Sequence, residues 1–178
     1  VITMLLYEGK AKQVYSTDNE NEYIVYYKDD ATAFNGEKKA SIQSKGILNN
    51  KICTIMFETL EKAGIKTHFI KALSDREQLV KKVTILPLEV IVRNITAGSF
   101  CKRYGVEEGI VLDKPIFEMS YKNDEYGDPL VNDDHAIALK LATQEEIDYI
   151  REQTLKISEI MKEFFLKLNL KLVVLKLE

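Results

Sequence analysis

The segment ILPLEVIVRNITAGS, residues 85–99, joins an almost unbroken apolar run to an abrupt polar end. The run LEVIV is typical of a strand covered on both faces, and Pro87 demands an edge, a break or a bend before it. Arg93 follows at a strand end, where it can fork onto a phosphate or carboxylate. Gly98 would let backbone amides approach an anion, and Ser99 adds donors at a helix start. A structural arginine–carboxylate pair with a Gly-Ser helix cap is the alternative, and the segment alone leaves both open.

Composition predicts one compact domain or two small lobes around a real core. The chain has 178 residues, of which 46% are hydrophobic and 30% charged, so disorder is excluded. Glu8 and Gly9 interrupt the first apolar stretch too early for a signal peptide, and no run of 18 apolar residues occurs. We therefore expect a soluble, cytoplasmic protein. Cys53 and Cys101 form no CxxC pair, which indicates core or near-core thiols and no zinc site.

The net charge of −3 argues against broad nucleic-acid binding, so any polyanionic ligand must meet local cations. Neighbouring cations stand at Lys10 and Lys12, Lys38 and Lys39, Lys81 and Lys82, and Lys102 and Arg103. Any one pair is also compatible with a solvated surface.

Periodicity and turn residues predict the secondary structure. Strands are expected at residues 4–7, 13–16, 22–28, 67–70, 79–86, 88–94 and 170–178. Irregular chain is expected mainly at residues 29–46 and at 109–135, where glycine, proline and acidic residues gather.

Two amphipathic helices are predicted, together with a short one over SFCKRYG, residues 99–105. The first runs from Gly46 to Ala63, with an apolar stripe that predicts a core helix. The second spans about residues 144–168 and begins with a capping box formed by Thr143 and Glu146.

The loop EGKAK, residues 8–12, is the first candidate anion site. A glycine between two strands lets the backbone approach a polyanion while two ammonium groups flank it. The loop does not match the Walker pattern, so an ordinary exposed hairpin is the alternative.

The stretch YKNDEYGDPLVNDDH, residues 121–135, is a second candidate functional segment. Its polar residues could orient an amine, ligate a divalent cation or merely solvate a loop: Lys122, Asp124, Asp128, Asn132 and Asp133. His68 and His135 show no metal-ligand spacing, so neither is assigned a catalytic role, and His68 is expected to pack in a strand.

Five stretches taken together resemble one family across essentially the whole chain. They are LLYEGKAKQVY, KDDATAFNGEKK, ILPLEVIVRNITAGS, YKNDEYGDPLVND and LVVLKLE. In this order they resemble the phosphoribosylaminoimidazole-succinocarboxamide synthase, or SAICAR synthetase, family of purine biosynthesis. The segment from Ile85 to Ser99 is the most diagnostic.

The resemblance implies an α+β fold of two lobes. Residues 1–86 would form an antiparallel, kinase-like ATP-binding lobe, and residues 87–178 a second lobe of helices and strands. The implied reaction ligates L-aspartate to the carboxylate of carboxyaminoimidazole ribonucleotide, with ATP and Mg²⁺ as cofactors and ADP and phosphate as products. A homodimer is expected, with no nucleic-acid or membrane partner.

The resemblance also implies roles for individual residues. Around ATP it places Gly9, Lys10, Ala11, Lys12, Val14, and the hinge residues Lys81, Lys82 and Leu86. Arg93, Gly98 and Ser99 would hold the ribonucleotide, Lys122 and Asp128 would serve catalysis, and Glu89 and Glu178 would bind the metal.

Two departures from the family pattern bear on activity. Val174 stands where the family has an aspartate, which removes a charged partner near the metal. Family members also continue past Glu178, through a second metal-binding acid and phosphate-gripping arginines, so the second lobe is truncated relative to them. A catalytically inactive nucleotide-binding or oligomer-forming remnant is therefore the alternative function. A kinase-like phosphotransferase is disfavoured because the sequence contains neither HRD nor DFG.

Overall fold

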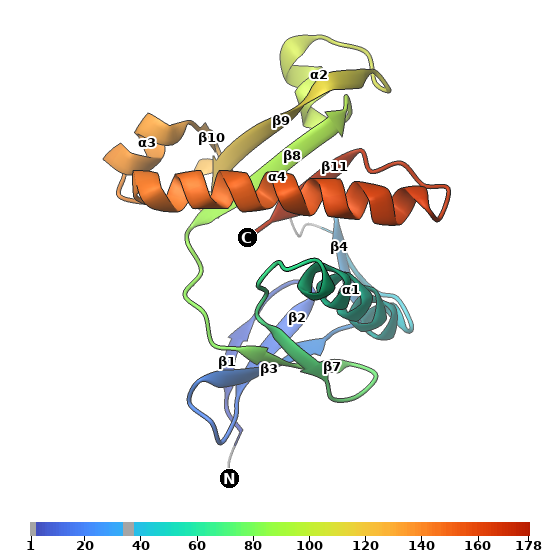
Figure 1. Cartoon of the computed structure of the whole chain (residues 1–178). Coiled ribbons are helices and arrows are strands. Elements are labelled where there is room, and N and C mark those ends of the chain that lie inside the picture. Colours follow the sequence, from blue (N-terminus) through green and yellow to red (C-terminus); the bar gives the residue numbers. More distant parts are fainter. Residues whose placement is uncertain (1–2, 34–37) are drawn as a thin grey trace. The chain divides into compact units, whose positions relative to one another are not determined.

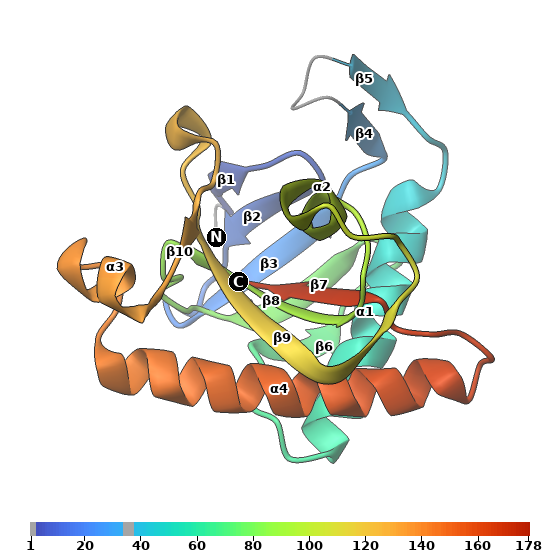
Figure 2. The ribbon, with the colours of Figure 1, turned by 90° about the horizontal axis from the view of Figure 1, so that it is seen from above.

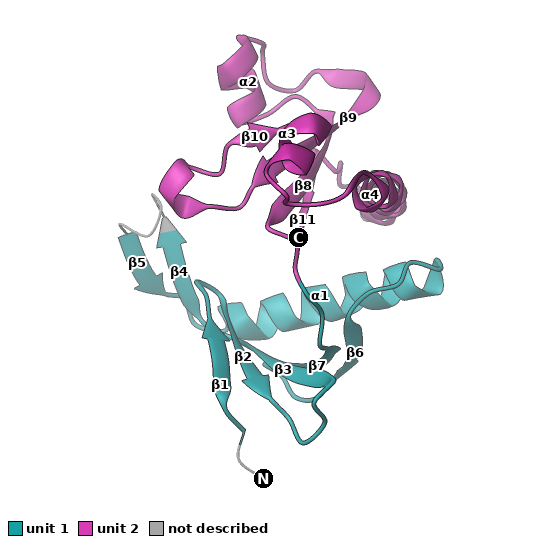
Figure 3. Ribbon diagram, turned by 90° about the vertical axis from the view of Figure 1, so that its left-hand side faces the viewer, with its two compact units in different colours: residues 1–84 teal, residues 85–178 magenta. Residues whose placement is uncertain are grey.

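The computed structural model describes residues 3–33 and 38–178. Its backbone divides into two compact units, residues 1–84 and residues 85–178, which Figure 3 shows in different colours.

The first unit is built on a five-stranded antiparallel sheet. The strand order is β1-β2-β3-β7-β6, and every neighbouring pair is antiparallel. The strands are β1 (Leu5–Glu8), β2 (Lys12–Ser16), β3 (Glu22–Tyr27), β6 (Phe69–Ala72) and β7 (Glu77–Lys81). The predicted hairpin over EGKAK and the third strand are confirmed. The strand predicted at 79–86 is too long, because β7 ends at Lys81, and the strand predicted at 67–70 begins later, at Phe69.

Helix α1 (Lys45–Lys62) covers one face of this sheet (Figure 3). The prediction that its apolar stripe packs in the core is wrong for Leu48, Ile52 and Ile55, whose side chains are all exposed. The buried residues of the helix are Gly46, Asn50 and Leu60, and Gln78 on β7 donates to the Asn50 backbone carbonyl and to Thr54 Oγ1. The buried Gln78 amide thus finds its acceptors in one backbone carbonyl and one threonine hydroxyl of the helix.

The prediction that residues 29–46 are mainly loop is wrong. Strands β4 (Asp30–Ala33) and β5 (Lys38–Ser41) pair antiparallel in a two-stranded sheet. Residues 34–37 of the predicted loop lie outside the described residues. The pairing escaped the sequence pattern because the strands are short and rich in lysine and alanine, which favour strands weakly.

Replacing Gly46 with alanine is expected to destabilise the protein. An added Cβ would lie 2.3 Å from the Tyr27 carbonyl oxygen and 2.6 Å from Arg76 Nη1, so the backbone must shift. Overpacking of this kind costs about 1–3 kcal/mol of unfolding free energy. Urea unfolding measures the loss, with Lys51→Ala on the exposed side of the same helix as control. An unfolding midpoint equal to that of the control variant would contradict the close approach.

The second unit holds a four-stranded antiparallel sheet in the order β10-β9-β8-β11. Its strands are β8 (Leu88–Ile95), β9 (Val111–Tyr121), β10 (Leu130–Val131) and β11 (Val174–Leu177). Strand β8 lies between β9 and β11 and is buried over almost its whole length, which confirms the prediction from LEVIV.

The 11-residue strand β9 contradicts the prediction that residues 109–135 are irregular. It pairs with β8 along its length, but the register shifts between Arg93 and Ile95, which face Ile116 and Val111. Pro115 falls inside this bulge, where no ladder N–H is needed. Reading Pro115 as a sign of irregular chain was therefore wrong, because a proline is compatible with a strand at such a bulge.

Helix α4 (Gln144–Leu166) lies across one face of this sheet (Figure 1 and Figure 2). Its predicted capping box is present, because Thr143 Oγ1 accepts from the Glu146 N–H and Glu146 Oε1 accepts from the Thr143 N–H. Shorter helical segments complete the unit: α2 (Ser99–Tyr104), the 3₁₀ turn η1 (Asp124–Tyr126) and α3 (Asp133–Ala138). The short helix predicted after Gly98 is confirmed.

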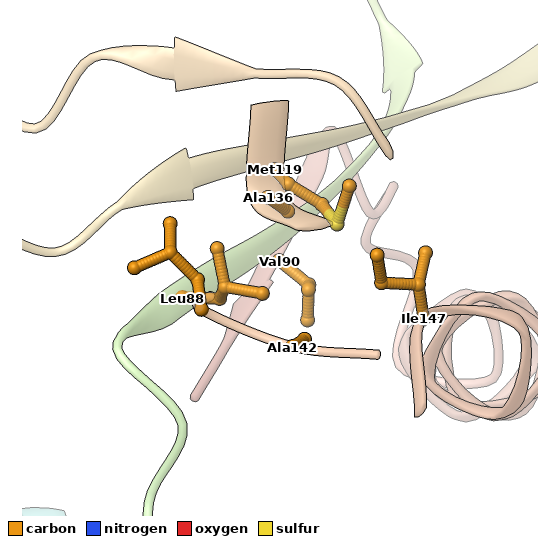
Figure 4. Close-up of a cluster of buried hydrophobic side chains, with 7 residues drawn as sticks. Leu88, Val90, Met119, Ala136, Ala142 and Ile147 are labelled. Atoms are coloured by element: carbon orange, nitrogen blue, oxygen red, sulfur yellow. The ribbon is translucent and has the colours of Figure 1, made fainter. Parts of the chain in front are cut away.

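The core of the second unit forms between α4, α3 and the sheet. Figure 4 shows Ile147 of α4 pointing toward Val90 and Met119 from the two central strands. Ile147 is fully buried, and Leu88, Ala136, Leu141 and Ala142 complete the cluster. Burial of this apolar surface is the main stabilising contribution to the unit.

Both cysteines are free thiols, with Cys53 half-buried and Cys101 buried, as predicted. No helix in the described part of the chain is long and apolar enough to cross a membrane.

Candidate functional site

The loop of residues 9–12 between β1 and β2 leaves amide donors for an anion. The Gly9 N–H donates to the Lys12 carbonyl at 2.8 Å, and the Lys28 N–H donates to the Ala11 carbonyl at 2.8 Å. Among the described residues, no backbone acceptor faces the N–H groups of Lys10 and Ala11. Two free amides beside two lysines suit a phosphate group.

Lys28 is a loop residue that the sequence reasoning missed. Its ammonium lies 2.8 Å from Glu8 Oε2 and 3.0 Å from Asp30 Oδ2, and it donates to the Gly9 carbonyl at 3.4 Å. The hydrogen bonds that Lys28 donates to Glu8 and then to Asp30 raise the pKa of Lys28. Lys28 connects the loop to the end of β3. The one sequence signal for this contact is the position of Lys28 directly after the strand.

The other residues predicted around ATP lie in three places: a core, an exposed surface and the second unit. Val14 is half-buried and packs against the core cluster of Val25, Tyr27 and Val80. Lys81 ends β7 and is exposed, as is Lys82, whose N–H donates to the Asn21 carbonyl at 2.8 Å. Leu86 is half-buried and belongs to the second unit, where it packs on the core described above.

The charges of Lys12 and Lys81 both affect the pKa of His68. His68 precedes β6 and its ring meets Phe57 edge-on, with centroids 5.2 Å apart. Burial lowers the pKa of His68, and the charges of Lys12 and Lys81 lower it further. His68 is therefore neutral near pH 7, and positive potential from both predicted lysines reaches it.

A polar hollow of about 350 Å³ adjoins the loop at Lys28 and is lined by Gln13, Tyr26, Lys28, Asp29, Asp30 and Arg76. None of these residues was predicted to bind ATP. Gln13 and Val14 point to opposite faces of β2, so the hollow is not on the Val14 face. Arg76 forks onto Asp29, with Nη1 to Oδ1 at 2.6 Å and Nη2 to Oδ2 at 3.0 Å.

This pair predicts a pH dependence of stability. The Arg76 guanidinium, followed by the Gly46 N–H, lowers the pKa of Asp29 to about 2. A carboxyl whose pKa is lower in the folded than in the unfolded protein contributes fully to the stability of the fold above about pH 4. That contribution is lost as the pH falls toward 2. We expect the urea midpoint of Asp29→Asn to fall less steeply over this window than that of the unaltered protein. The exposed Asp18→Asn serves as control, and parallel curves for all three proteins would refute the contribution of the pair.

Arg93, Gly98 and Ser99 come together at the end of β8, and we call them the arginine turn. Arg93 donates from Nη2 to Ser99 Oγ at 3.2 Å and from Nη1 to the Ala97 carbonyl at 3.3 Å. Gly98 has φ +58° and ψ −132°, a conformation that favours glycine. The Ser99 hydroxyl accepts from Arg93 and so keeps its own proton to donate to a ligand.

The arginine–carboxylate pair left open by the sequence also exists. Arg93 Nε donates to Glu118 Oε1 on β9, and Arg103 Nη2 lies 2.9 Å from Glu118 Oε2. Neither Glu118 nor the role of Arg103 was foreseen, because the partners are 25 and 15 residues from Glu118 in sequence. Arg93 is thus both structurally paired and in contact with Ser99.

Glu89, Lys122 and Glu178 gather from three separate segments, and we call them the carboxylate cluster. Lys122 Nζ lies 3.2 Å from Glu178 Oε1 and 3.6 Å from Glu89 Oε2, and Lys176 Nζ is 4.0 Å from Glu89 Oε1. Burial disfavours the charged form of Lys122, but Glu178, Glu89 and Asp128 together outweigh it and raise the pKa of Lys122. The ammonium is therefore held charged between two carboxylates.

The acidic stretch 121–135 divides into two parts. Asp128 Oδ1 accepts from the Asn123 N–H at 2.8 Å, and its charge acts on Lys122. Asn132 instead caps α3, and Asp133 pairs with Arg151 at 2.5 Å. Only Lys122 and Asp128 of this stretch therefore belong with the carboxylate cluster.

The arginine turn and the carboxylate cluster share one face of the sheet in the second unit. Glu89, Ile91 and Arg93 alternate with Leu88 and Val90, which pack toward α4. Val174 lies directly opposite Arg93 in the β8–β11 register, so its side chain is on that same face. The position that departs from the family pattern is therefore beside the predicted substrate arginine.

A family model described as SAICAR synthetase matches residues 5–178. The chain is 67% identical over 173 residues to the phosphoribosylaminoimidazole-succinocarboxamide synthase of Finegoldia magna, covering 97% of this chain and 75% of the relative. It is 63% identical over 174 residues to the enzyme of that name from Clostridium botulinum, covering 98% of this chain and 74% of that relative.

Solved structures show the same similarity. The phosphoribosylaminoimidazole-succinocarboxamide synthase of Ehrlichia chaffeensis superposes with a TM-score of 0.94 at 46% identity, covering 97% of this chain and 73% of the other. A SAICAR synthetase in complex with ADP superposes with a TM-score of 0.91 at 46% identity, covering 96% and 72%. The predicted α+β class, with antiparallel sheets, is confirmed.

Proposed function

The chain belongs to the SAICAR synthetase family, and we propose on this premise that it is the ATP-dependent ligase that forms SAICAR in de novo purine biosynthesis. The substrates would be carboxyaminoimidazole ribonucleotide and L-aspartate, and the products SAICAR, ADP and phosphate. A homodimeric state and a cytoplasmic location are proposed on the same premise.

The observation that carries this proposal is the shared face of the second sheet. It presents a guanidinium with a serine hydroxyl at the arginine turn and two carboxylates with an ammonium in the carboxylate cluster. All three substrates are anions, while the whole chain has a net charge of −3. Binding therefore depends on local cations placed by the fold, and this face supplies them.

We assign the phosphates of ATP to the loop of residues 9–12. The amides of Lys10 and Ala11 and the ammonium groups of Lys10 and Lys12 would contact these phosphates, with Gly9 allowing close approach. Val14 would pack on the adenine, and Lys81, Lys82 and Leu86 would serve as the hinge. The ADP complex of a related synthetase supports nucleotide binding by this fold.

We assign the ribonucleotide to the arginine turn. Arg93 would donate an N–H that its protein partners leave over to an anionic group of the substrate, and Ser99 would donate its hydroxyl proton to the same group. Gly98 would let the backbone adopt the positive φ that this turn requires, which would strain a residue with a Cβ.

The chemistry requires activation, because a free carboxylate repels a nucleophile and has no leaving group. Transfer of the γ-phosphoryl group of ATP to the substrate carboxylate would give an acyl phosphate. The aspartate amine then attacks the carbonyl carbon, a C–N bond forms, the C–O bond to phosphate breaks, and the amine loses a proton. Lys122 would offset charge on the phosphoryl oxygens, and Asp128 would orient the amine.

We assign Mg²⁺ to the carboxylates of the carboxylate cluster, where it would bind beside the Lys122 ammonium. Glu89 and Glu178 supply the hard oxygen donors that this ion prefers, and they lie close enough to share Lys122. No group of three potential ligands occurs in the described residues, so water and phosphate oxygens would complete the coordination. When bound, the ion offsets the negative charge of the phosphates.

An omission assay tests the proposal. ADP release from the purified chain is measured with Mg–ATP, carboxyaminoimidazole ribonucleotide and L-aspartate, leaving out each substrate in turn. Release that requires all three establishes the ligase. A folded protein that shows an ATP-dependent thermal shift but no release would instead be the inactive nucleotide-binding remnant.

Lys12→Ala tests the phosphate loop. Lys12 is exposed at the start of β2, so the fold should survive its loss. Removal of one charge-assisted contact to phosphate is expected to weaken Mg–ATP binding about tenfold. Calorimetry measures the change, with the exposed Lys71→Ala on β6 as matched control. Unchanged ATP affinity in Lys12→Ala would remove the loop from the nucleotide site.

A further inference from the structure

Glu118 of β9 contacts two arginines from the arginine turn and helix α2. It lies opposite Ile91 in the β8–β9 register, so its side chain is on the face that carries Arg93. One carboxylate oxygen accepts from Arg93 and the other from Arg103. The Glu118 side chain is only 10% exposed and that of Arg93 only 5%, so their charges are largely removed from water.

Through these arginines, Glu118 fixes both ends of a short segment. Arg93 reaches the Ala97 carbonyl and the Ser99 hydroxyl on either side of Gly98. Arg103 stands in the last turn of α2, which begins at Ser99. The ring of Phe100 lies 5.7 Å from the Arg93 guanidinium carbon and limits its movement. A turn that contains a flexible glycine is thus tied to a rigid strand by a single carboxylate.

We propose that Glu118 is a positioning residue for substrate binding, which holds Arg93 against the arginine turn and Arg103 beside it. This proposal rests on the assignment of the ribonucleotide to Arg93 and Ser99 made above. Without the carboxylate, two neighbouring guanidinium groups lose their common counter-charge, and a largely buried Arg93 must seek another partner. The Ser99 hydroxyl would then lose its hydrogen bond, and the turn would no longer be preformed.

Glu118 also fixes the position of Arg103. Its side chain is 34% exposed, and one of its nitrogens is committed to Glu118. The remaining donors face no other hydrogen-bond acceptor among the described residues. Glu118 therefore presents a second, partly exposed cation next to the turn, where a doubly charged phosphate would meet two guanidinium groups.

Glu118→Gln tests the proposal, because it keeps the size of the side chain and removes its charge. We measure dissociation constants for the ribonucleotide and for Mg–ATP by calorimetry, and kcat and KM by ADP release. The ribonucleotide constant is expected to rise about 10- to 100-fold, as for other misplaced binding groups, while Mg–ATP binding stays unchanged. Asp113→Asn removes an exposed carboxylate from the same strand and should leave both constants unchanged.

A double-mutant cycle separates positioning from a general loss of stability. If Glu118 acts through Arg93, then Glu118→Gln combined with Arg93→Lys should bind the ribonucleotide little worse than Arg93→Lys alone. Additive losses would overturn the proposal. If Glu118→Gln fails to fold, Glu118→Asp takes its place, since the shorter side chain cannot reach both arginines, and wild-type affinity in that variant would overturn the proposal.

Ribonucleotide binding by the unaltered protein distinguishes failure of the positioning role from failure of the proposed function. If it binds the ribonucleotide and folded Glu118→Gln binds it equally well, only the positioning role fails. If the unaltered protein does not bind the ribonucleotide, the proposed function fails and the positioning role fails with it.

Discussion

Arg93→Lys is expected to lower kcat/KM for carboxyaminoimidazole ribonucleotide by about 100-fold, because an arginine fork and a lysine point charge are not equivalent. Arg93 makes three separate contacts from one guanidinium, to Glu118, Ala97 and Ser99. An ammonium keeps the positive charge but cannot reach three acceptors in these directions. The effect should fall mainly on the KM of the ribonucleotide, with the KM of ATP unchanged.

The same variant should also be less stable. Acceptors that lose a buried partner cost about 1–3 kcal/mol each, and the Arg93 side chain is 5% exposed. Urea unfolding therefore accompanies the kinetics, and activity is measured where each variant is fully folded. Lys114→Arg, an exposed change on β9, is the matched control for a basic substitution in the same sheet. Wild-type kinetics with the ribonucleotide in Arg93→Lys would show that the arginine turn does not contact this substrate.

Ile147→Ala is expected to destabilise the protein by about 2–5 kcal/mol, because it removes a fully buried side chain and leaves a cavity. Ile147 is 0% exposed and contributes the first buried side chain of α4 to the core cluster. Leu88 and Val90 of β8 belong to the same cluster, so the loss also loosens the strand that carries Glu89 and Arg93.

Urea unfolding followed by circular dichroism measures this loss. Tyr149→Ala is the matched control, since Tyr149 lies two residues along the same helix and is 58% exposed. A change within about 0.5 kcal/mol is expected for that exposed position. Equal losses in the two variants would contradict the packing of α4 on the sheet.

Local signals in the sequence predicted several elements correctly. Thr143 and Glu146 mark the start of α4 because the capping box is a contact between residues three positions apart. Strand β8 was recognised from LEVIV because burial on both faces demands a continuous apolar run. The glycine loop between β1 and β2 was likewise recognisable, since a hairpin needs a turn within a few residues.

Long-range pairing explains the errors. Strand β9 was missed because Pro115 is a breaker by itself and becomes acceptable only inside the bulge opposite β8. The exposed stripe of α1 was misjudged because the sequence does not say which face the sheet will meet. The contacts with the sheet decide it: Gln78 on β7 donates to the backbone carbonyl of Asn50 and to Thr54 Oγ1, and the Asn50 side chain donates to the Ser74 carbonyl.

The sequence by itself determined the family, the class of fold and most of the residue types that the proposed reaction needs, because these are written in short motifs and local periodicity. Only the tertiary structure decided that Glu118 joins Arg93 to Arg103 and that Lys122 lies between Glu89 and Glu178. These contacts depend on strand register, and register is set by the packing of whole strands against a core. Side chains far apart in the chain become neighbours only after that packing is complete.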